Sequence, residues 1–357
     1  MRYAVVFITI FLLTSCNEDT ESNPMTSKKL SKIVIENGQF INGGGDVFFP
    51  WGFNYTNADD VGLIEDDWLD ENVWETIKSD FTEMKDLGAN VIRIHLQYHQ
   101  FMIDVETPNQ VNFDRLKELV EYADDQELYL DITCLAAYRK SDQPNYYTSL
   151  SDAERWSTQK VFFEKIAKEL NDYPAVFAFN LMNEPVVSVG CETNLNCEWT
   201  PGDGLGGFHF VQNVTRTPGN EFASTLKNWM SELSLSIRTN DSETLITTGL
   251  LALGSIKQFE TDLDYLSPHI YPVSGEIQLS IDKVISSQSD VPLVIEETSN
   301  LYCNIQELKE FLNGIDGKYN GLMGHYHGKP LDELDDSILN DAIQKNFLQF
   351  FIDNNPN

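Results

Sequence analysis

Two glutamates stand shortly after apolar runs of the kind that form buried strands. Glu184 follows the run 176–182, and Glu297 follows the run 292–296. Two carboxyl groups that meet at one site can divide the work of a displacement, because one protonates the leaving group while the other attacks. Cleavage of a glycosidic bond uses such a pair, roughly 5–5.5 Å apart when the second carboxylate is the nucleophile. Glu184 and one member of the pair Glu296-Glu297 are therefore the candidate catalytic residues.

Other polar side chains follow other apolar runs at corresponding positions. Arg93 and His95 end the second run, and His269 and Tyr271 end the sixth. The carboxyl ends of parallel strands lie at the same edge of a sheet, so we expect these side chains to converge. An arginine beside one carboxyl favours its ionised form, as a nucleophile requires. The sequence therefore predicts one polar site at the mouth of a barrel.

The elements that would position this site are short apolar runs separated by segments of helical periodicity. Such alternation is typical of βα units and a parallel sheet. The expected strands are residues 51–55, 90–95, 128–134, 176–182, 244–248, 265–269, 292–296 and 321–325, and the expected helices are 74–87, 113–125, 152–171, 220–238, 277–286, 305–313 and 336–351. Eight strands with intervening helices predict a (β/α)8 TIM barrel. The alternative, a doubly wound open sheet, lacks support because Asn54-Tyr55-Thr56-Asn57 replaces its Gly-rich fingerprint.

A hairpin precedes the barrel. Segments 32–35, 39–41 and 47–49 alternate apolar and polar residues, with Asn37-Gly38 between the first two. These are hairpin signals. We expect this hairpin to close the bottom of the barrel, and we expect residues 32–357 to form one catalytic domain.

The chain resembles clan A glycoside hydrolases, and within that clan glycoside hydrolase family 5, the cellulase and β-mannanase family. The matching motifs are Ala89-Asn90-Val91-Ile92-Arg93-Ile94, Asn180-Leu181-Met182-Asn183-Glu184-Pro185, His269-Ile270-Tyr271-Pro272 and Pro292-Leu293-Val294-Ile295-Glu296-Glu297. The resemblance extends from residue 32 to residue 351. It implies a retaining β-glycosidase, cellulase-like or mannanase-like and endo-acting on a neutral β-linked glycan, that needs no cofactor.

The resemblance also implies a role for each matching residue. Glu184 would be the acid/base and Glu297 the nucleophile. Asn183 would hydrogen-bond the sugar 2-hydroxyl, and Arg93 would hold the nucleophile in place and ionised.

Two more residues match the family pattern, and two positions depart from it. Tyr271 would reach the nucleophile, and His269 would line the acid/base side. Thr133 stands where many members carry a histidine. The family's tryptophan after the eighth strand is absent from Gly321-Leu322-Met323-Gly324-His325-Tyr326-His327, so His325 or Tyr326 would supply the stacking face for the sugar.

Several polar residues have plainer interpretations. Glu296 is more often a surface acid at such a position, or else a partner of the site. His95 has either a structural role or a place in the cleft. His325 and His327 have the spacing of two metal ligands, but no third ligand is evident, so we expect no metal. The acidic stretch 59–71 lacks the regular spacing of a calcium loop and is best interpreted as a solvated loop.

A long irregular insertion follows the fourth strand, at residues 186–219. Loops after barrel strands build the active-site face, so this segment would shape a cleft. Trp199 would stack on a sugar there. Cys191 and Cys197 bracket a short polar stretch, which in an exported protein favours a loop disulfide. We expect no zinc site at these cysteines, since no histidine lies at ligand spacing from them.

The composition restricts the partners. The chain has 24 Lys and Arg against 56 Asp and Glu, giving a net charge of −32 over 357 residues. Nucleic-acid binding depends on neutralising phosphates with cations, so nucleic acid is excluded as a partner. A neutral polysaccharide or oligosaccharide fits, and we expect a monomer. The alternative function is a non-catalytic glycan-binding lipoprotein that retains the barrel.

The N-terminus has the pattern of an export signal. Arg2 precedes a mostly apolar run at residues 4–13, which is too short to span a bilayer and fits a secretory signal. Leu13-Thr14-Ser15-Cys16 resembles a bacterial lipoprotein cleavage box; the alternative is an ordinary signal peptide with an incidental cysteine. We therefore expect a signal peptide at residues 1–15, lipidation of Cys16, a flexible tether at 16–31, and an outer-membrane lipoprotein exposed at the cell surface. The membrane would be contacted through the lipid alone.

Overall fold

The computed structural model describes residues 29–56, 63–138, 142–187, 213–216, 220–251, 256–326 and 328–356. Eight parallel strands form one sheet in the order β8-β7-β6-β5-β4-β3-β10-β9. Parallel bridges from Leu266 to Leu293 and from His269 to Glu297 join the two end strands, so the sheet closes into a barrel. The predicted (β/α)8 fold is confirmed.

The barrel strands follow the predicted runs closely. They are β3 (Trp51–Tyr55), β4 (Val91–Gln97), β5 (Tyr129–Ala136), β6 (Val176–Asn183), β7 (Leu245–Leu251), β8 (Ser267–His269), β9 (Val294–Ile295) and β10 (Gly321–Tyr326). The sixth and seventh runs form shorter strands than expected. Pro268 has no N–H group and interrupts the ladder there.

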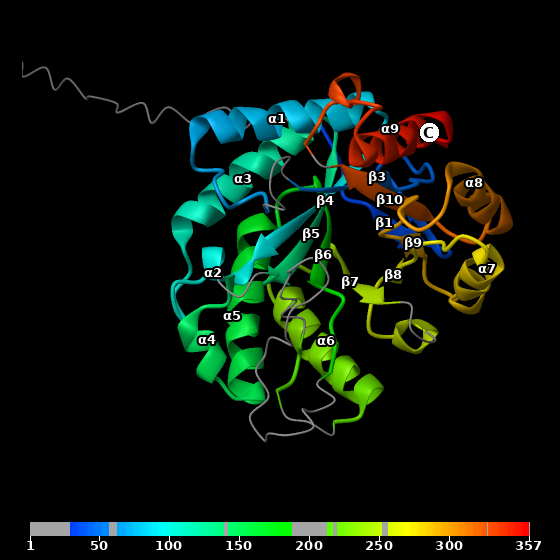
Figure 1. Ribbon diagram of the computed structural model, residues 1–357. Helices are drawn as coiled ribbons and strands as arrows, with labels where there is room; N and C mark the ends of the chain where they lie inside the picture. The colour runs from blue at the N-terminus through cyan, green and yellow to red at the C-terminus, as the bar shows by residue number, and fades with distance from the viewer. Residues whose placement is uncertain are drawn as a thin grey trace, which may run out of the picture.

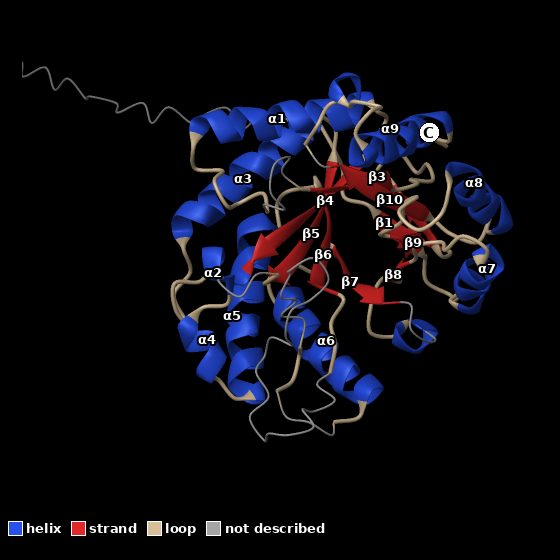
Figure 2. Cartoon of the chain, viewed as in Figure 1, coloured by secondary structure: helices blue, strands red, loops and turns tan. Residues whose placement is uncertain are grey.

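Helices surround the barrel on its outside (Figures 1 and 2). They are α1 (Glu71–Asp86), α2 (Tyr98–Phe101), α3 (Gln110–Asp125), α4 (Asn145–Ser149), α5 (Asp152–Leu170), α6 (Phe222–Arg238), α7 (Ile277–Ser286), α8 (Ile305–Gly314) and α9 (Leu339–Asp353). The short helices α2 and α4 were not predicted, because four or five residues show no helical periodicity. Within the described residues, no helix has both the length and the hydrophobicity to cross a bilayer.

Local sequence signals explain where the helices begin and end. Asp70 caps α1 by accepting a hydrogen bond from the backbone N–H of Asn72. Gly88 then takes a φ of +97° just after that helix, a conformation that glycine adopts without steric cost. Ser151 and Glu154 form a reciprocal capping box at the start of α5.

The hairpin of β1 (Val34–Glu36) and β2 (Gln39–Ile41) closes the lower end of the barrel. Phe40 is 1% exposed and packs edge-on against Phe177 and Tyr265, with ring centroids 5.2 and 5.3 Å away. It belongs to a buried cluster formed by the first inward-facing side chains of the barrel strands. The hairpin therefore seals the end of the barrel opposite the predicted site.

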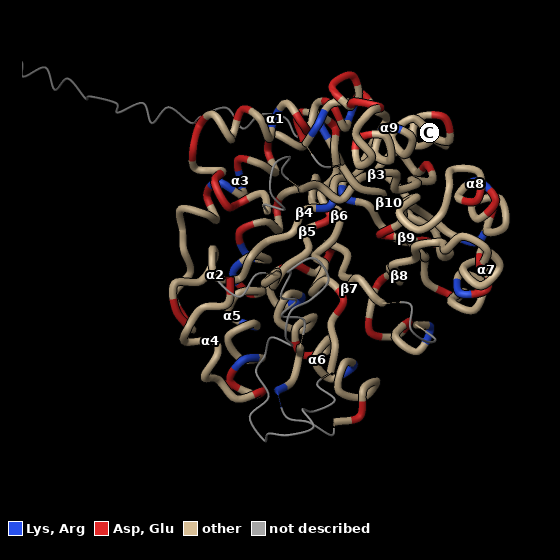
Figure 3. The backbone as a smooth tube through the Cα atoms, in the orientation of Figure 1, with Lys and Arg blue, Asp and Glu red and all other residues tan. Residues whose placement is uncertain are grey.

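Charged residues lie mostly on the helices and loops around the barrel, with acidic positions outnumbering basic ones (Figure 3). Several basic side chains pair with acids on neighbouring helices. Arg115 of α3, for example, lies 2.8 Å from Glu71 of α1. Such exposed pairs contribute little to stability. Buried ion pairs, in contrast, lie inside the barrel, where Arg93 approaches Glu296 and Glu297.

Candidate active site

The barrel interior changes from apolar to polar toward the carboxyl ends of its strands. Side chains alternate between the inside and the outside along each strand. The inward positions nearest the hairpin are apolar, among them Val91, Val294 and Met323. Two residues further along, the inward positions are buried and polar: Asn54, Arg93, Asp131, Asn180, Thr247, Ser267 and Glu296. This polar layer lies directly beneath the predicted pair of glutamates.

Glu184 lies at the end of β6 in an uncommon backbone conformation. Its φ is +50°, in the left-handed region that residues other than glycine rarely adopt. Its backbone N–H donates to the carbonyl of Gly249 on β7, at 2.9 Å. Its side chain is 20% exposed, and its Oε1 lies 2.8 Å from Nδ1 of His269. Such conformations persist where the surrounding structure imposes them, often at functional sites.

Glu297 lies across the barrel, just after β9. Arg93 donates to its Oε1 at 2.8 Å, and Tyr271 donates to its Oε2 at 2.7 Å. Burial alone would raise the pKa of Glu297, but His269 and Arg93 outweigh burial and hold that pKa well below its usual range. Glu297 is therefore ionised at neutral pH.

His269 lies between the carboxylates. Its Nδ1 lies 2.8 Å from Glu184 and 3.4 Å from Glu297, and its Nε2 lies 3.5 Å from Glu296. Burial lowers the pKa of His269, but these three carboxylates outweigh burial and raise it to about 9. The ring is therefore protonated at neutral pH and directs an N–H toward each side.

Arg93 holds the centre of the polar layer. Its Nη1 donates to Asn54 at 2.6 Å and to Glu297 at 2.8 Å. Its Nη2 donates to Oδ1 of Asn183 at 3.0 Å and lies 3.4 Å from Glu296. One buried guanidinium thus fixes both the candidate nucleophile and the amide that precedes Glu184.

Tyr271 and His325 form a short relay to Glu297. The rings are stacked with an interplanar angle of 16°, and the Tyr271 hydroxyl lies 2.7 Å from Nε2 of His325. Because that hydroxyl gives its single proton to Glu297, we assign the donated proton of the second bond to Nε2 of His325. His325 therefore supports the nucleophile through Tyr271.

Sequence reasoning missed several residues of the polar layer. The interpretation of Glu296 as a surface acid is wrong, because its side chain is fully buried and points into the barrel. Asn180 donates to Glu296 at 2.9 Å and accepts from the backbone N–H of Gly249 at 3.0 Å. Asp131 accepts from Tyr265 at 2.8 Å. The available signal was a lone polar residue at an inward position of an otherwise apolar strand.

Gly249 leaves the space in which these groups meet. An added Cβ would lie 2.6 Å from His269 Nε2, 2.8 Å from Arg93 Nη2 and 2.9 Å from Glu296 Oε2. No side chain fits at this position without displacing a charged group of the site.

Tyr326 does not belong to the site. It is fully buried on the outer side of β10, stacked near Tyr55 with ring centroids 6.4 Å apart. Consecutive residues of a strand point to opposite faces, so His325 and Tyr326 cannot both face the barrel interior. The expectation that Tyr326 contacts substrate is corrected accordingly.

His95 lies near the carboxyl end of β4 and is 8% exposed. Its Nδ1 lies 2.5 Å from the Tyr138 hydroxyl. Burial, followed by the charge of Arg93, lowers its pKa well below the usual value, so the ring is neutral. Contact between His95 and substrate stays a prediction. Four other predicted residues lie outside the described part of the chain: Cys16, Cys191, Cys197 and Trp199.

Glu184, His269 and Glu297 each place one ligand-type atom within 4.8 Å of the others. Three such groups could hold a cation on geometric grounds. Here Arg93 and protonated His269 already supply positive charge to the carboxylates. We therefore assign the three groups to acid–base and nucleophilic chemistry.

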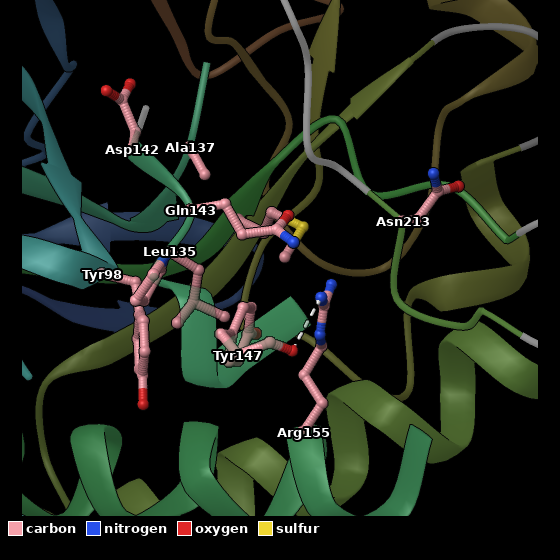
Figure 4. Close-up of a pocket in the computed structure, with 10 residues that line it drawn as sticks. Tyr98, Leu135, Ala137, Asp142, Gln143, Tyr147, Arg155 and Asn213 are labelled. Carbon is pink, nitrogen blue, oxygen red and sulfur yellow. Dashed lines mark hydrogen bonds between the residues drawn. The ribbon is translucent and has the colours of Figure 1, made fainter. Parts of the chain in front are cut away.

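A separate small cavity lies beside β5 and β6 (Figure 4). Figure 4 shows Arg155 of α5 facing Tyr147 of α4; the guanidinium lies 3.9 Å from that ring's centroid. Neither candidate glutamate lines this cavity. It is therefore distinct from the active site.

Comparisons with known proteins agree with this geometry. A family model described as "Cellulase (glycosyl hydrolase family 5)" matches residues 51–274, well over half of the chain. The chain belongs to glycosyl hydrolase family 5. A search of curated proteins found no match.

Solved structures with this fold include other glycosidases. An exo-β-1,4-mannosidase, Op5Man5, from Opitutaceae bacterium strain TAV5 has a TM-score of 0.65 and 15% identity, over 90% of this chain and 61% of that one. A β-1,4-mannanase from the sea hare Aplysia kurodai has a TM-score of 0.61 and 14% identity, over 90% and 96% of the two chains. An endo-1,4-β-mannanase from Eisenia fetida has a TM-score of 0.61 and 14% identity, over 91% and 96%.

As a family 5 member, the protein is a glycosidase that acts on O-glycosyl compounds, with a polysaccharide or oligosaccharide substrate. The matched segment includes Arg93, Glu184 and Tyr271 but ends before Glu297. The placement of Glu297 therefore depends on the barrel geometry, which brings it to the same mouth.

Proposed function

We propose that the protein is a retaining β-glycoside hydrolase that cleaves a neutral β-linked glycan by double displacement. The observation that carries this proposal is the approach of the two carboxylates: an oxygen of Glu184 and an oxygen of Glu297 lie within 4.8 Å of each other. Retaining enzymes hold their carboxyl groups about 5–5.5 Å apart, whereas inverting enzymes leave about 6.5–9.5 Å for a water. The close spacing favours direct attack on the sugar.

In the first step, Glu184 gives a proton to the glycosidic oxygen as the bond to the anomeric carbon breaks. Glu297, ionised beside Arg93, forms a bond to that carbon and yields a glycosyl-enzyme ester. In the second step, Glu184 takes a proton from a water whose oxygen attacks the anomeric carbon, and the bond to Glu297 breaks. Glu184 is thereby protonated again, and Glu297 is again a carboxylate.

We propose endo attack on a β-1,4-linked glycan and take β-mannan as the first substrate to test. Mannanases and a mannosidase are among the structural neighbours, while the matching family model is named for cellulase. The net charge of −32 disfavours anionic glycans. Incubation with mannan and cellulose, followed by product sizing, separates the two substrates. A ladder of oligosaccharides supports endo attack, whereas release of a single short product contradicts it.

The stereochemistry of the first product tests the mechanism. Proton NMR of the reducing end released early in the reaction should show the β-anomer. Early release of the α-anomer would contradict double displacement. A 2-fluoro glycoside with a good leaving group should label the wild-type enzyme on Glu297, and Glu297→Gln should take no label.

Replacement of the acid/base tests the other half of the mechanism. Glu184→Ala should slow hydrolysis of alkyl glycosides far more than that of activated aryl glycosides, because the latter need no protonation. Equal slowing of both classes would contradict its role as the acid.

The alternative is a glycan-binding protein without catalysis. One observation favours it: the eighth barrel strand, Gly321–Tyr326, contains no tryptophan, and His325 is its last inward-facing residue. Glycan binding without fluoro-glycoside labelling or turnover would establish this alternative.

We also propose that Cys16 is lipidated and anchors the enzyme at the outer membrane. The pattern Leu13-Thr14-Ser15-Cys16 supports this proposal. Cys16→Ser should move the protein from the membrane fraction to the soluble fraction; continued sedimentation with membranes would contradict it.

A further inference from the structure

Two carboxyl groups are completely buried in the polar layer beneath the active site. Asp131 lies on β5 and Glu296 directly after β9, and each is 0% exposed. Oδ2 of Asp131 accepts from the Tyr265 hydroxyl at 2.8 Å, and Oε2 of Glu296 accepts from Asn180 at 2.9 Å. One oxygen of each group is therefore satisfied by a neutral donor.

The second oxygen of each carboxyl group lacks such a donor. Oδ1 of Asp131 and Oε1 of Glu296 are buried and accept no hydrogen bond from a donor group among the described residues. The two carboxyl groups lie within hydrogen-bonding reach of each other. Two carboxylates in such contact, away from water, cannot both be ionised. A single proton shared by the two groups removes this conflict.

The positions of the cations decide which group carries that proton. Oε2 of Glu296 lies 3.4 Å from Arg93 and 3.5 Å from His269. Asp131, in contrast, has no cationic nitrogen within 4.0 Å in the described part of the chain. The anionic charge therefore belongs on Glu296 and the proton on Asp131.

Electrostatics agree with this assignment. Burial, and then the charge of Glu296, raise the pKa of Asp131 well above its usual value. Burial opposes ionisation of Glu296, but Arg93 and His269 outweigh it and lower the pKa of Glu296. The remaining titratable groups that act on the pair or on its cations are Cys134, Tyr265, Glu184, Glu297, Tyr138, His95 and Tyr271.

We propose that Asp131 is a neutral carboxylic acid that donates its proton to Glu296, and that Glu296 positions Arg93 and His269 beneath the catalytic glutamates. The positioning part rests on the proposed function. Both are positioning residues, since neither reaches the mouth of the barrel. Glu296 supplies the negative charge that holds Arg93 against Glu297 and the proton on His269.

Infrared spectroscopy tests the proton directly. The difference spectrum of wild type minus Asp131→Asn at pH 7 should contain the carbonyl band of a protonated carboxylic acid. Glu65, a second buried acid whose pKa is raised to about 8, cancels in this difference. Asparagine retains the geometry, because its amide oxygen can accept from Tyr265 and its amide nitrogen can donate to Glu296. Absence of the band would overturn the proposal.

Stability gives a second readout. A protonated Asp131 must lose its proton on unfolding once the pH exceeds the unfolded-state pKa of about 3.9. The folded state then binds one more proton than the unfolded state, so stability falls as the pH rises. The denaturation midpoint of the wild type should therefore decrease relative to that of Asp131→Asn between pH 4 and pH 7. The opposite trend would mean that Asp131 is ionised and would overturn the proposal.

The positioning role is tested with Glu296→Gln, which removes the charge while preserving the shape. NMR of labelled histidines should show the His269 titration midpoint about one unit or more lower than in wild type, and kcat/KM should fall at least about tenfold. Asp131→Asn should leave the His269 midpoint in place, because its amide nitrogen still donates to Glu296 and the charge of Glu296 is retained. An unchanged His269 midpoint in Glu296→Gln would overturn the positioning role.

These measurements are separable from the test of the proposed function. The infrared and NMR readouts need no turnover, whereas labelling of Glu297 reports on catalysis alone. An infrared band without any labelling of Glu297 would confirm that Asp131 and Glu296 share a proton. It would also reject the proposal that Glu296 positions groups for catalysis.

Discussion

At the scale of single residues, the site is a small set of carboxyl groups held in different states by their neighbours. Glu297 is kept ionised by Arg93 and protonated His269, although it is nearly buried. Glu184 is more exposed, with 20% of its side chain accessible, and has His269 as its partner. The two glutamates thus differ in exposure and in hydrogen-bond partners, as the proposed roles of nucleophile and acid require.

The hydrogen bond from the Tyr271 hydroxyl to Glu297 can be removed without removing the aromatic ring. Tyr271→Phe deletes one donor to Glu297 and breaks the relay to His325. Loss of a hydrogen bond to a charged group costs about 1.5–3 kcal/mol, so kcat/KM should fall by roughly 10- to 100-fold. Steady-state kinetics on one aryl glycoside measures this change.

Tyr302→Phe is the matched control. Its ring packs against Tyr271 with centroids 6.2 Å apart, but its side chain is 54% exposed. Removing its hydroxyl should leave kcat/KM unchanged. Equal losses in the two variants would show that the effect does not depend on the hydrogen bond to Glu297.

At the scale of elements, β7 contributes to the site by leaving room for side chains from other strands. Gly249 lies on β7 where Arg93 from β4, His269 from β8 and Glu296 after β9 come together. Its backbone also accepts from Glu184 and donates to Asn180. The strand thus connects Glu184 with the polar layer.

Gly249→Ala should therefore displace charged groups rather than merely fill space. We expect kcat/KM to fall by at least about tenfold, because misplacement of a catalytic group by a fraction of an ångström is costly. Gly314→Ala is a control on a helix, where the new Cβ meets only the flexible Ile281 side chain. This variant should retain the kcat/KM of the wild type. Wild-type kinetics in Gly249→Ala would contradict the crowding argument.

At the scale of the whole molecule, the barrel has two ends with different tasks. One end carries the chemistry, and the hairpin seals the other with an apolar cluster around Phe40. Figure 1 shows the helices that surround the strands. The lower end should therefore affect stability and leave the chemistry alone.

Phe40→Ala tests this separation. Removing a buried phenylalanine costs about 3–5 kcal/mol, so the denaturant midpoint should fall markedly. Under conditions where the variant is folded, its KM should match that of the wild type. Val47→Ala, at a position 62% exposed in the same segment, should change stability by less than about 0.5 kcal/mol. A large change in KM for Phe40→Ala would show that the two ends are coupled.

The amino-acid sequence by itself was enough to predict the barrel fold and its strand boundaries to within a few positions. It also predicted the polar residues that follow the strands at the mouth of the barrel. Periodicity carries this information because a buried parallel strand must be apolar and must end where polar groups begin. Glu184, the pair Glu296-Glu297, Arg93, His269 and Tyr271 were found in this way, and the resemblance to family 5 then selected Glu297 as the nucleophile.

Only the tertiary structure decided which polar residues are buried together. Glu296 and Tyr326 were misjudged because one residue of offset in a strand moves a side chain to the opposite face. The contact between Asp131 and Glu296 joins positions 165 residues apart in number, from 131 to 296. No local pattern encodes such a contact, since it depends on how the closed sheet brings its third and seventh strands face to face.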